Sequence, residues 1–213
     1  MNLAIDVGNT NSKYAFFDEN QITESGIIGS LAAFKSFLSD RSGDFERAIV
    51  CSVRYTESEL LPFFKENQRP VYLSHHTPVP LTMAYKTPET LGMDRLAAAV
   101  GGNYLFSGSG VMVIDIGTCI TYDYVSEEGV FEGGVISPGV ELRYKAMHDY
   151  TARLPLLTDR EADGLIGVNT RSAMKSGVVN GIVGEIEYMI SQFLLKTPDF
   201  SSLFFFTYFY FFL

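Results

Sequence analysis

Short apolar runs alternate with polar turns along most of the chain, and their lengths predict a fold of strands and helices. Near the N-terminus, apolar residues 3–5 and 14–17 flank a polar turn, which predicts a β-hairpin. Residues 21–29 can supply a third strand, and apolar residues at helical spacing within 31–38 predict an amphipathic helix. The pattern continues with a strand at 47–53, a helix at 56–64 and a strand at 71–73. The predicted order of this half is βββαβαβ.

The second half contains longer helical segments. Three apolar runs predict strands, at residues 111–114, 120–125 and 135–136. Three segments with helical spacing predict helices, at residues 96–104, 140–148 and 164–195. In the last of these, Gly177, Gly181 and Gly184 lie on one face, which permits the close approach of another helix, for instance across a dimer axis.

The composition of the 213-residue chain narrows its possible functions. With 46% hydrophobic residues the chain can form a folded core, as one large domain or two small ones. Its net charge of −9 argues against nucleic acid as a partner, because nucleic-acid-binding surfaces are usually basic. Cys51 and Cys119 lie in apolar runs without C-x-x-C spacing, so we expect buried thiols in a reducing cytoplasm. We see no signal peptide before the first strand, and we expect no membrane partner.

The first polar turn carries candidate chemistry. Asp6 ends the first predicted strand, and Gly8 lets the backbone of the turn approach a ligand closely because it has no Cβ. Residues 9–12 offer side-chain donors beside exposed backbone N–H groups, and Lys13 adds a positive charge. Such a loop can hold phosphates, with Asp6 placed to hold Mg²⁺ directly or through water. For this stretch alone, an ordinary glycine–asparagine turn is the alternative.

The same pattern recurs 109 residues later. An apolar run at 111–114 ends in Asp115, and Gly117 and Thr118 follow, again a carboxylate, a glycine and a small polar residue. Two such turns suggest duplicated halves that face one nucleotide. In this respect the chain resembles the acetate kinase, sugar kinase, Hsp70 and actin superfamily, whose two RNase H-like halves clamp ATP in the cleft between them. The resemblance implies an α/β fold with mixed sheets flanked by helices, and halves at residues 1–107 and 108–213.

Asp94 and Arg95 lie where a loop passes into the helix predicted at 96–104. At the start of a helix, a carboxylate and a guanidinium are commonly a cap and a surface ion pair. Between two phosphate-type loops a second interpretation arises. Arg95 can bind a substrate carboxylate in bidentate fashion, and Asp94 can accept a proton from an attacking hydroxyl.

Five motifs, taken in order, closely resemble those of the type III pantothenate kinase family. They are Asp6-Val7-Gly8-Asn9-Thr10, Leu91-Gly92-Met93-Asp94-Arg95, Asp115-Ile116-Gly117-Thr118, Gly133-Gly134-Val135-Ile136-Ser137-Pro138-Gly139 and Thr151-Ala152-Arg153-Leu154-Pro155. The resemblance covers residues 1–195, and the ordered set is far more specific than any single motif. It implies the ATP-dependent phosphorylation of pantothenate to 4′-phosphopantothenate, the first step of coenzyme A biosynthesis.

The resemblance also implies roles for individual residues. Asp94 would be the general base, and Asp115 would coordinate a monovalent cation, potassium or ammonium. The pantothenate pocket would be completed across a homodimer interface. The ATP site would comprise Asp6, Val7, Gly8, Asn9, Thr10, Asn11, Ser12, Lys13 and Thr118. The pantothenate site would comprise Tyr85, Gly92, Met93, Asp94, Arg95 and Thr170.

Small residues surround the short strand predicted at 135–136. Gly133 and Gly134 precede it, and Pro138 and Gly139 follow it as a turn into the next helix. We expect these residues to let a substrate pass close to the backbone. Tight turns alone are the alternative.

The end of the chain departs from the family pattern. Family members continue into another strand, a Gly-Gly-Asp turn near the adenosine and a final helix. Here residues 201–213 contain eight Phe and Tyr residues and no charge, glycine or proline. This block is too short for a membrane helix, which needs about twenty apolar residues. We interpret it as a truncated or altered end after residue 196, which can still supply one buried strand but leaves part of the adenosine pocket missing.

Two other functions stay open on the sequence alone. One is a kinase or phosphohydrolase of the same superfamily with a different substrate. The other is a nucleotide-binding dimer without catalytic activity, as a consequence of the altered end.

Overall fold

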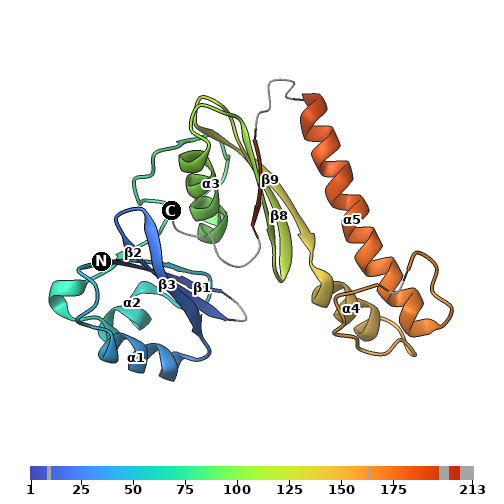
Figure 1. Ribbon diagram of the computed structural model, residues 1–213, viewed down its shortest axis with the longest axis horizontal. Coiled ribbons are helices and arrows are strands. Elements are labelled where there is room, and N and C mark those ends of the chain that lie inside the picture. Colours follow the sequence, from blue (N-terminus) through green and yellow to red (C-terminus); the bar gives the residue numbers. More distant parts are fainter. Residues whose placement is uncertain (9–10, 163, 197–201, 207–213) are drawn as a thin grey trace.

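The computed structural model describes residues 1–8, 11–162, 164–196 and 202–206. Within these residues the chain forms two five-stranded mixed sheets with helices on their faces (Figure 1). The predicted α/β class, with two mixed sheets flanked by helices, is confirmed.

The first sheet has the strand order β3-β2-β1-β4-β5. Its strands are β1 (Asn2–Val7), β2 (Ser12–Asp18), β3 (Gln21–Ile28), β4 (Arg47–Ser52) and β5 (Val71–Tyr72). β1 pairs antiparallel with β2 and parallel with β4, so Asp6 has Lys13 opposite it on one side and Cys51 on the other. Buried apolar residues of the strands, of α1 (Leu31–Asp40) and of α2 (Glu57–Leu60) form one core. This core fixes the end of β1, where Asp6 lies.

The second sheet has the strand order β10-β7-β8-β9-β6. Its strands are β6 (Thr82–Met83), β7 (Val111–Ile116), β8 (Cys119–Val125), β9 (Val130–Pro138) and β10 (Ser202–Phe206). Its helices are α3 (Met93–Leu105), α4 (Val140–Asp149) and α5 (Thr170–Lys196).

Side chains of β7 alternate between two helices on opposite faces of this sheet. Val111 and Val113 pack in a cluster with Ala98 of α3, whereas Met112 and Ile114 pack in a cluster with residues of α5. Helix α3 also contacts β4 of the first sheet, so it lies between the two sheets (Figure 1). Its N-terminal turn is therefore placed beside the ends of both β1 and β7.

The helix predicted over 164–195 is wrong at its start, because α5 begins at Thr170. Gly164 adopts a φ of 146°, which favours glycine and breaks helical geometry. Asn169 caps the helix, since its Oδ1 accepts a hydrogen bond from the Ser172 N–H at 3.0 Å. The preceding residues are apolar at helical spacing, but Ile166 is 84% exposed, so the pattern there does not mark a packed face.

Two strands of the second sheet also differ from the prediction. β9 is longer than the strand predicted at 135–136, so Gly133 and Gly134 lie inside it and do not precede it. Residues 82–83 form β6, a strand that the sequence pattern did not predict, and it joins the second sheet beside β9 although it precedes residue 107. The aromatic block does supply a strand: β10 pairs in parallel with β7. The rest of that block lies outside the described residues.

Candidate active site

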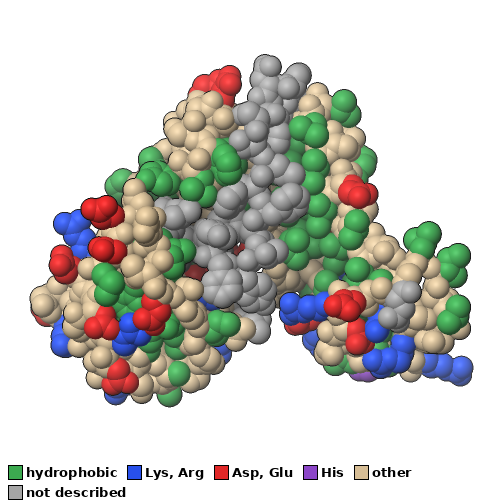
Figure 2. Space-filling model, in the orientation of Figure 1, with side chains coloured by type: hydrophobic (Ala, Val, Ile, Leu, Met, Phe, Trp, Pro, Cys, Tyr) green, Lys and Arg blue, Asp and Glu red, His purple; other side chains and the backbone are tan. Residues whose placement is uncertain are grey.

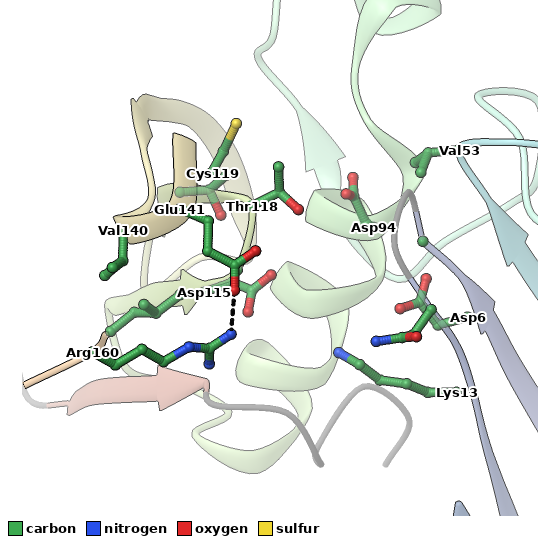
Figure 3. Close-up of a pocket in the computed structure, with 15 residues that line it drawn as sticks. Asp6, Lys13, Val53, Asp94, Asp115, Thr118, Cys119, Val140, Glu141 and Arg160 are labelled. Carbon is green, nitrogen blue, oxygen red and sulfur yellow. Dashed lines mark hydrogen bonds and ion pairs between the residues drawn. The ribbon is translucent and has the colours of Figure 1, made fainter. Parts of the chain in front are cut away.

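A cavity of about 460 Å³ lies where the C-terminal ends of β1 and β7 meet the N-terminal turn of α3 (Figure 3). Asp6 and Lys13 line it from the first sheet, and Asp115 lines it from the second. Asp94, in the first turn of α3, points into it from between the sheets. These three aspartate carboxylates and the Lys13 ammonium group therefore face a single space.

Asp6 is a buried carboxylate, and one of its two oxygens lacks a hydrogen-bond partner within the described residues. Asp6 is 5% exposed, and the oxygen without a partner among those residues is Oδ1. Burial raises the pKa of Asp6 to about 7, an effect that Lys13 opposes and that Asp94 and Asp115 increase. A buried carboxylate of this kind is unfavourable unless a ligand or a cation approaches it. Asp6 is therefore a candidate cation ligand.

Asp115 occupies the equivalent position at the end of β7. Burial raises its pKa to about 6; Lys13 again lowers the pKa and Asp94 raises it. The repeated Asp-x-Gly pattern predicted that the two strand ends face one ligand, and in the structure both face one cavity.

Gly139 packs against the turn that follows Asp115. The Gly139 N–H donates to the Thr118 carbonyl oxygen at 3.0 Å, and the Gly117 N–H donates to the Cys119 carbonyl oxygen at 2.9 Å. A Cβ at position 139 would lie 2.2 Å from the Gly117 carbonyl oxygen, so only glycine fits. Thr118 is exposed and lines the cavity, so its hydroxyl and the turn backbone are accessible from it.

Glycine also determines how Asp94 is oriented. The Arg95 N–H donates to Asp94 Oδ1 at 2.8 Å. A Cβ at Gly92 would lie 2.4 Å from the same oxygen, so glycine at 92 keeps this carboxylate position accessible. The other carboxylate oxygen of Asp94 is left to face the cavity.

The guanidinium of Arg95 is buried in an ion pair with Asp123 of β8. Arg95 Nε lies 3.0 Å from Asp123 Oδ1, and Nη2 lies 2.5 Å from the same oxygen. The two side chains are 6% and 1% exposed. The edge of the guanidinium that we expected to bind a substrate carboxylate in bidentate fashion therefore already binds Asp123. The absent Cβ of Gly134 leaves room for this pair, since a Cβ there would lie 2.5 Å from Asp123 Oδ1.

Seven of the predicted ATP-site, catalytic and metal residues line the cavity together: Asp6, Gly8, Asn11, Lys13, Asp94, Asp115 and Thr118. Asn9 and Thr10 lie outside the described residues.

The other predicted site residues lie elsewhere. The Val7 side chain is buried in the core of the first sheet, and Ser12 lines a separate small pocket beside α1. Met93 and Tyr85 pack against a cluster of buried residues beneath α3, and the Tyr85 ring lies 5.9 Å from Arg95 Cζ. Thr170 is exposed at the start of α5 and does not line the cavity.

Several lining residues were missed by reasoning from the sequence. Cys119 and Thr121 come from β8, Glu141 comes from α4, and Arg160 comes from the segment that follows α4. Arg160 Nη2 donates to Glu141 Oε1 at 2.7 Å at the rim of the cavity (Figure 3). Alternation along β8 could have indicated Thr121, because it points to the opposite face from the buried Ile120 and Tyr122. The sequence offers no comparable signal for Glu141 or Arg160.

Comparisons with known proteins agree with the motifs. A model of the type III pantothenate kinase family matches residues 2–192. A type III pantothenate kinase from Flavobacterium psychrophilum is 39% identical over 206 residues, which covers 94% of this chain and 84% of the relative. One from Phocaeicola vulgatus is 39% identical over 207 residues, which covers 93% of this chain and 83% of the relative.

Two solved structures share the fold at low sequence identity. A candidate 2-dehydro-3-deoxygalactonokinase from Sinorhizobium meliloti has a TM-score of 0.53 at 11% identity, covering 97% of this chain and 93% of its own. A candidate Baf family transcriptional activator from Campylobacter jejuni has a TM-score of 0.50 at 20% identity, covering 94% and 80%. These likenesses show the actin-like ATPase fold.

Proposed function

The chain belongs to the type III pantothenate kinase family, and from this premise we propose that it transfers the γ-phosphoryl group of ATP to the primary hydroxyl of pantothenate. The product is 4′-phosphopantothenate, and the reaction is the first step of coenzyme A biosynthesis. The observation that carries the proposal is the convergence of Asp6, Asp94 and Asp115 on one cavity between the two sheets.

In this proposal the ATP phosphates lie between the turns that follow β1 and β7. Lys13 supplies positive charge from β2, and Gly8 and Gly117, which line the cavity, would offer their backbone to phosphate oxygens. Thr118 contributes its hydroxyl. Catalysis of phosphoryl transfer rests mainly on such positioning and on electrostatic stabilisation of the transferred group. The halves proposed at residues 1–107 and 108–213 would each contribute one of the two turns.

Asp94 is the proposed general base. It points into the cavity between Asp6 and Asp115, so an attacking hydroxyl bound there can transfer its proton to the free carboxylate oxygen (Figure 3). The surrounding pantothenate site would use Tyr85, Gly92 and Met93. Arg95 is also assigned to this site, where its guanidinium, bound to Asp123, would contribute positive charge towards the substrate carboxylate.

The residues of the cavity fit the two cations that the family resemblance implies. Asp6 has an unpartnered buried oxygen among the described residues, and Asp115 offers a second desolvated carboxylate; both are hard ligands that suit Mg²⁺ and K⁺. Within the part of the chain that the structure describes, no three His, Cys, Asp or Glu side chains are arranged to hold a metal by themselves. Water and phosphate oxygens would therefore complete each coordination shell. A bound Mg²⁺ neutralises charge on the transferred phosphoryl group.

A homodimer is part of the proposal, with Thr170 contacting pantothenate in the partner's site. Its support is the exposed apolar surface along α5, which Figure 2 shows as a band of hydrophobic side chains. Tyr188 is 61% exposed and Leu195 is 76% exposed, and exposed apolar patches often mark protein interfaces. A Cβ added at Gly177 or at Gly184 would meet no atom of the described residues within 4 Å, so this face leaves space for a partner.

We also propose a cytoplasmic location. Its support is that Cys51, which is buried, and Cys119, which is half-buried, are both free thiols. Among the described helices, none is long and apolar enough to span a membrane.

The decisive experiment measures ADP formation by the purified chain with pantothenate, and in parallel with other small hydroxy acids and sugars. We expect turnover with pantothenate and identification of 4′-phosphopantothenate by mass spectrometry. If ATP is consumed with a different acceptor and not with pantothenate, that acceptor is the substrate and the proposal is wrong. Calorimetry with a non-hydrolysable ATP analogue distinguishes an enzyme from a protein that only binds nucleotide, because the latter would bind the analogue but show no turnover.

A further inference from the structure

Glu185, in the middle of α5, accepts hydrogen bonds from three other elements. Tyr122 of β8 donates to its Oε1 at 2.9 Å, and Ser137 of β9 donates to its Oε2 at 2.9 Å. Arg143 of α4 forms an ion pair with the same Oε2 through Nη2. Burial alone would raise the pKa of Glu185, but the donors, Arg143 first, outweigh it and hold the pKa below its usual value. Glu185 is therefore ionised at neutral pH, and it connects α5 to β8, β9 and α4.

Arg143 links Glu185 to the end of β9, where the turn into α4 begins. Its Nε donates to the Pro138 carbonyl oxygen at 2.7 Å, and its Nη2 also donates to Ser137 Oγ at 3.1 Å. Its backbone N–H donates to the Gly139 carbonyl oxygen at 3.0 Å. The Arg143 side chain, oriented by Glu185, thus holds Ser137 and Pro138 directly before Gly139, and the backbone bond to Gly139 is the first hydrogen bond of α4.

Gly139 in turn supports the loop that lines the cavity. It donates to the Thr118 carbonyl oxygen, and its Cα lies so close to Gly117 that a Cβ would meet the Gly117 carbonyl oxygen at 2.2 Å. A shift of Gly139 therefore displaces Gly117 and Thr118, because packed backbone cannot absorb the movement.

We propose that Glu185 is a positioning residue for ATP: through Arg143 and Gly139 it fixes the Gly117–Thr118 turn against the phosphates. Glu185 does not line the cavity, so it acts only through these groups. The inference rests on the proposed function, because it assigns the Gly117–Thr118 turn to ATP.

The test compares four variants of the full chain. Glu185→Gln removes the charge that orients Arg143, and Arg143→Lys removes the Nε–H that donates to the Pro138 carbonyl oxygen. Glu187→Gln is a matched control on an exposed position of the same helix. Tyr122→Phe is a control for stability, because it removes one donor to Glu185 and leaves Arg143 in place.

We expect Glu185→Gln and Arg143→Lys to raise the KM for ATP by about tenfold while the KM for pantothenate stays within about twofold, since small displacements of positioning groups have large effects. Amide hydrogen exchange at Gly139 should be faster in both, with or without nucleotide. Both controls should match the wild type in KM and in exchange.

Wild-type KM for ATP or wild-type exchange at Gly139 in Glu185→Gln would overturn the inference, even if its Tm falls, because Glu185 would then be only structural. A wild-type chain without turnover on pantothenate would refute the proposed function instead. Exchange at Gly139 would still decide whether Glu185 controls the turn.

Discussion

Asp6 and Asp115 come from different sheets; the folded chain buries the carboxylate of Asp6 and half-buries that of Asp115. Burial is the largest cause of both raised pKa values, about 7 for Asp6 and about 6 for Asp115. Lys13 lowers the pKa of both, because its ammonium group lies near both carboxylates. Functional sites commonly hold groups in environments that disfavour their charge, because the ligand supplies the missing partner.

The stability of the nucleotide-free protein should therefore depend on Asp6. Because the folded state raises the pKa of this acid from 3.8 to about 7, the folded chain binds its proton more tightly than the unfolded chain does. Its contribution to the free energy of unfolding is fully present below pH 3.8 and is lost as pH rises towards 7. Asp6→Asn should therefore stabilise the protein at pH 8, by up to about 4 kcal/mol, and the gain should disappear near pH 4.

Thermal unfolding of both proteins in EDTA, across this pH range, measures the effect. We expect Asp6→Asn to raise the Tm at pH 8 by several degrees. The same variant should respond weakly to Mg²⁺ in a turnover assay, because an amide is a poor ligand for a hard dication. A Tm difference that does not change with pH would contradict the burial of an ionisable group at this position.

Asp94 should be required for turnover and dispensable for folding. Asp94→Asn keeps the shape of the side chain and an acceptor for the Arg95 N–H, so we expect an unchanged Tm. Turnover should fall about a hundredfold or more, the usual scale for a positioned general base. Calorimetry should show ATP and pantothenate affinities close to those of the wild type. Glu89→Gln, on the exposed turn before α3, is the control, and near-normal turnover in Asp94→Asn would remove Asp94 from the mechanism.

Asp115 tests the monovalent cation. We expect wild-type turnover to be high in potassium or ammonium and low in sodium, since oxygen sites discriminate these ions by cavity size and ligand number. Asp115→Ala should reduce activity sharply and abolish this discrimination. Rates in matched potassium and sodium buffers provide the measurement. Equal wild-type rates in the two buffers would rule out the cation role.

At the scale of elements, hydrophobic periodicity predicted most strands and helices because each has one apolar face. It failed where apolar residues are exposed, as before α5, and where a two-residue strand such as β6 depends only on its neighbour β9. The candidate site was predictable where local motifs carry it, at Asp6, Asp94 and Asp115. The Arg95–Asp123 pair was not, because its partners are 28 residues apart and meet only when α3 packs on β8.

The turn between β9 and α4 should tolerate no side chain at its glycine. In Gly139→Ala the new Cβ would overlap the Gly117 carbonyl oxygen, so the turn or the Gly117–Thr118 loop must move. We expect a loss of stability of about 1–3 kcal/mol, as for other overpacked sites, together with a raised KM for ATP. Gly43→Ala is the control, since a Cβ there meets no atom of the described chain within 4 Å. Equal stability of the two variants in urea titration would contradict the close packing at 139.

At the scale of the whole molecule, the two sheets place Lys13 and the carboxylates of Asp6 and Asp115 around one cavity, yet Thr170 lies outside it. Thr170 is exposed at the start of α5, on the far side of the second sheet from α3 (Figure 1). If it contacts pantothenate at all, it must do so in another copy of the chain. A complete pantothenate site would then require residues from two chains.

Subunit complementation tests that consequence. Thr170→Val and Asp94→Asn should each form dimers with little activity, because every site in them lacks one of the two residues. In a mixed dimer, the Asp94→Asn chain supplies wild-type Thr170 to the site that holds wild-type Asp94, so one site is intact. Random mixing makes half of the dimers mixed, so co-refolded chains should regain about a quarter of wild-type activity. Light scattering measures whether the chains form dimers. An equal mixture of untagged and tagged Thr170→Val chains, refolded in the same way, controls for the effect of refolding on activity. Activity no greater than the average of the two variants would show that Thr170 does not complete a partner's site.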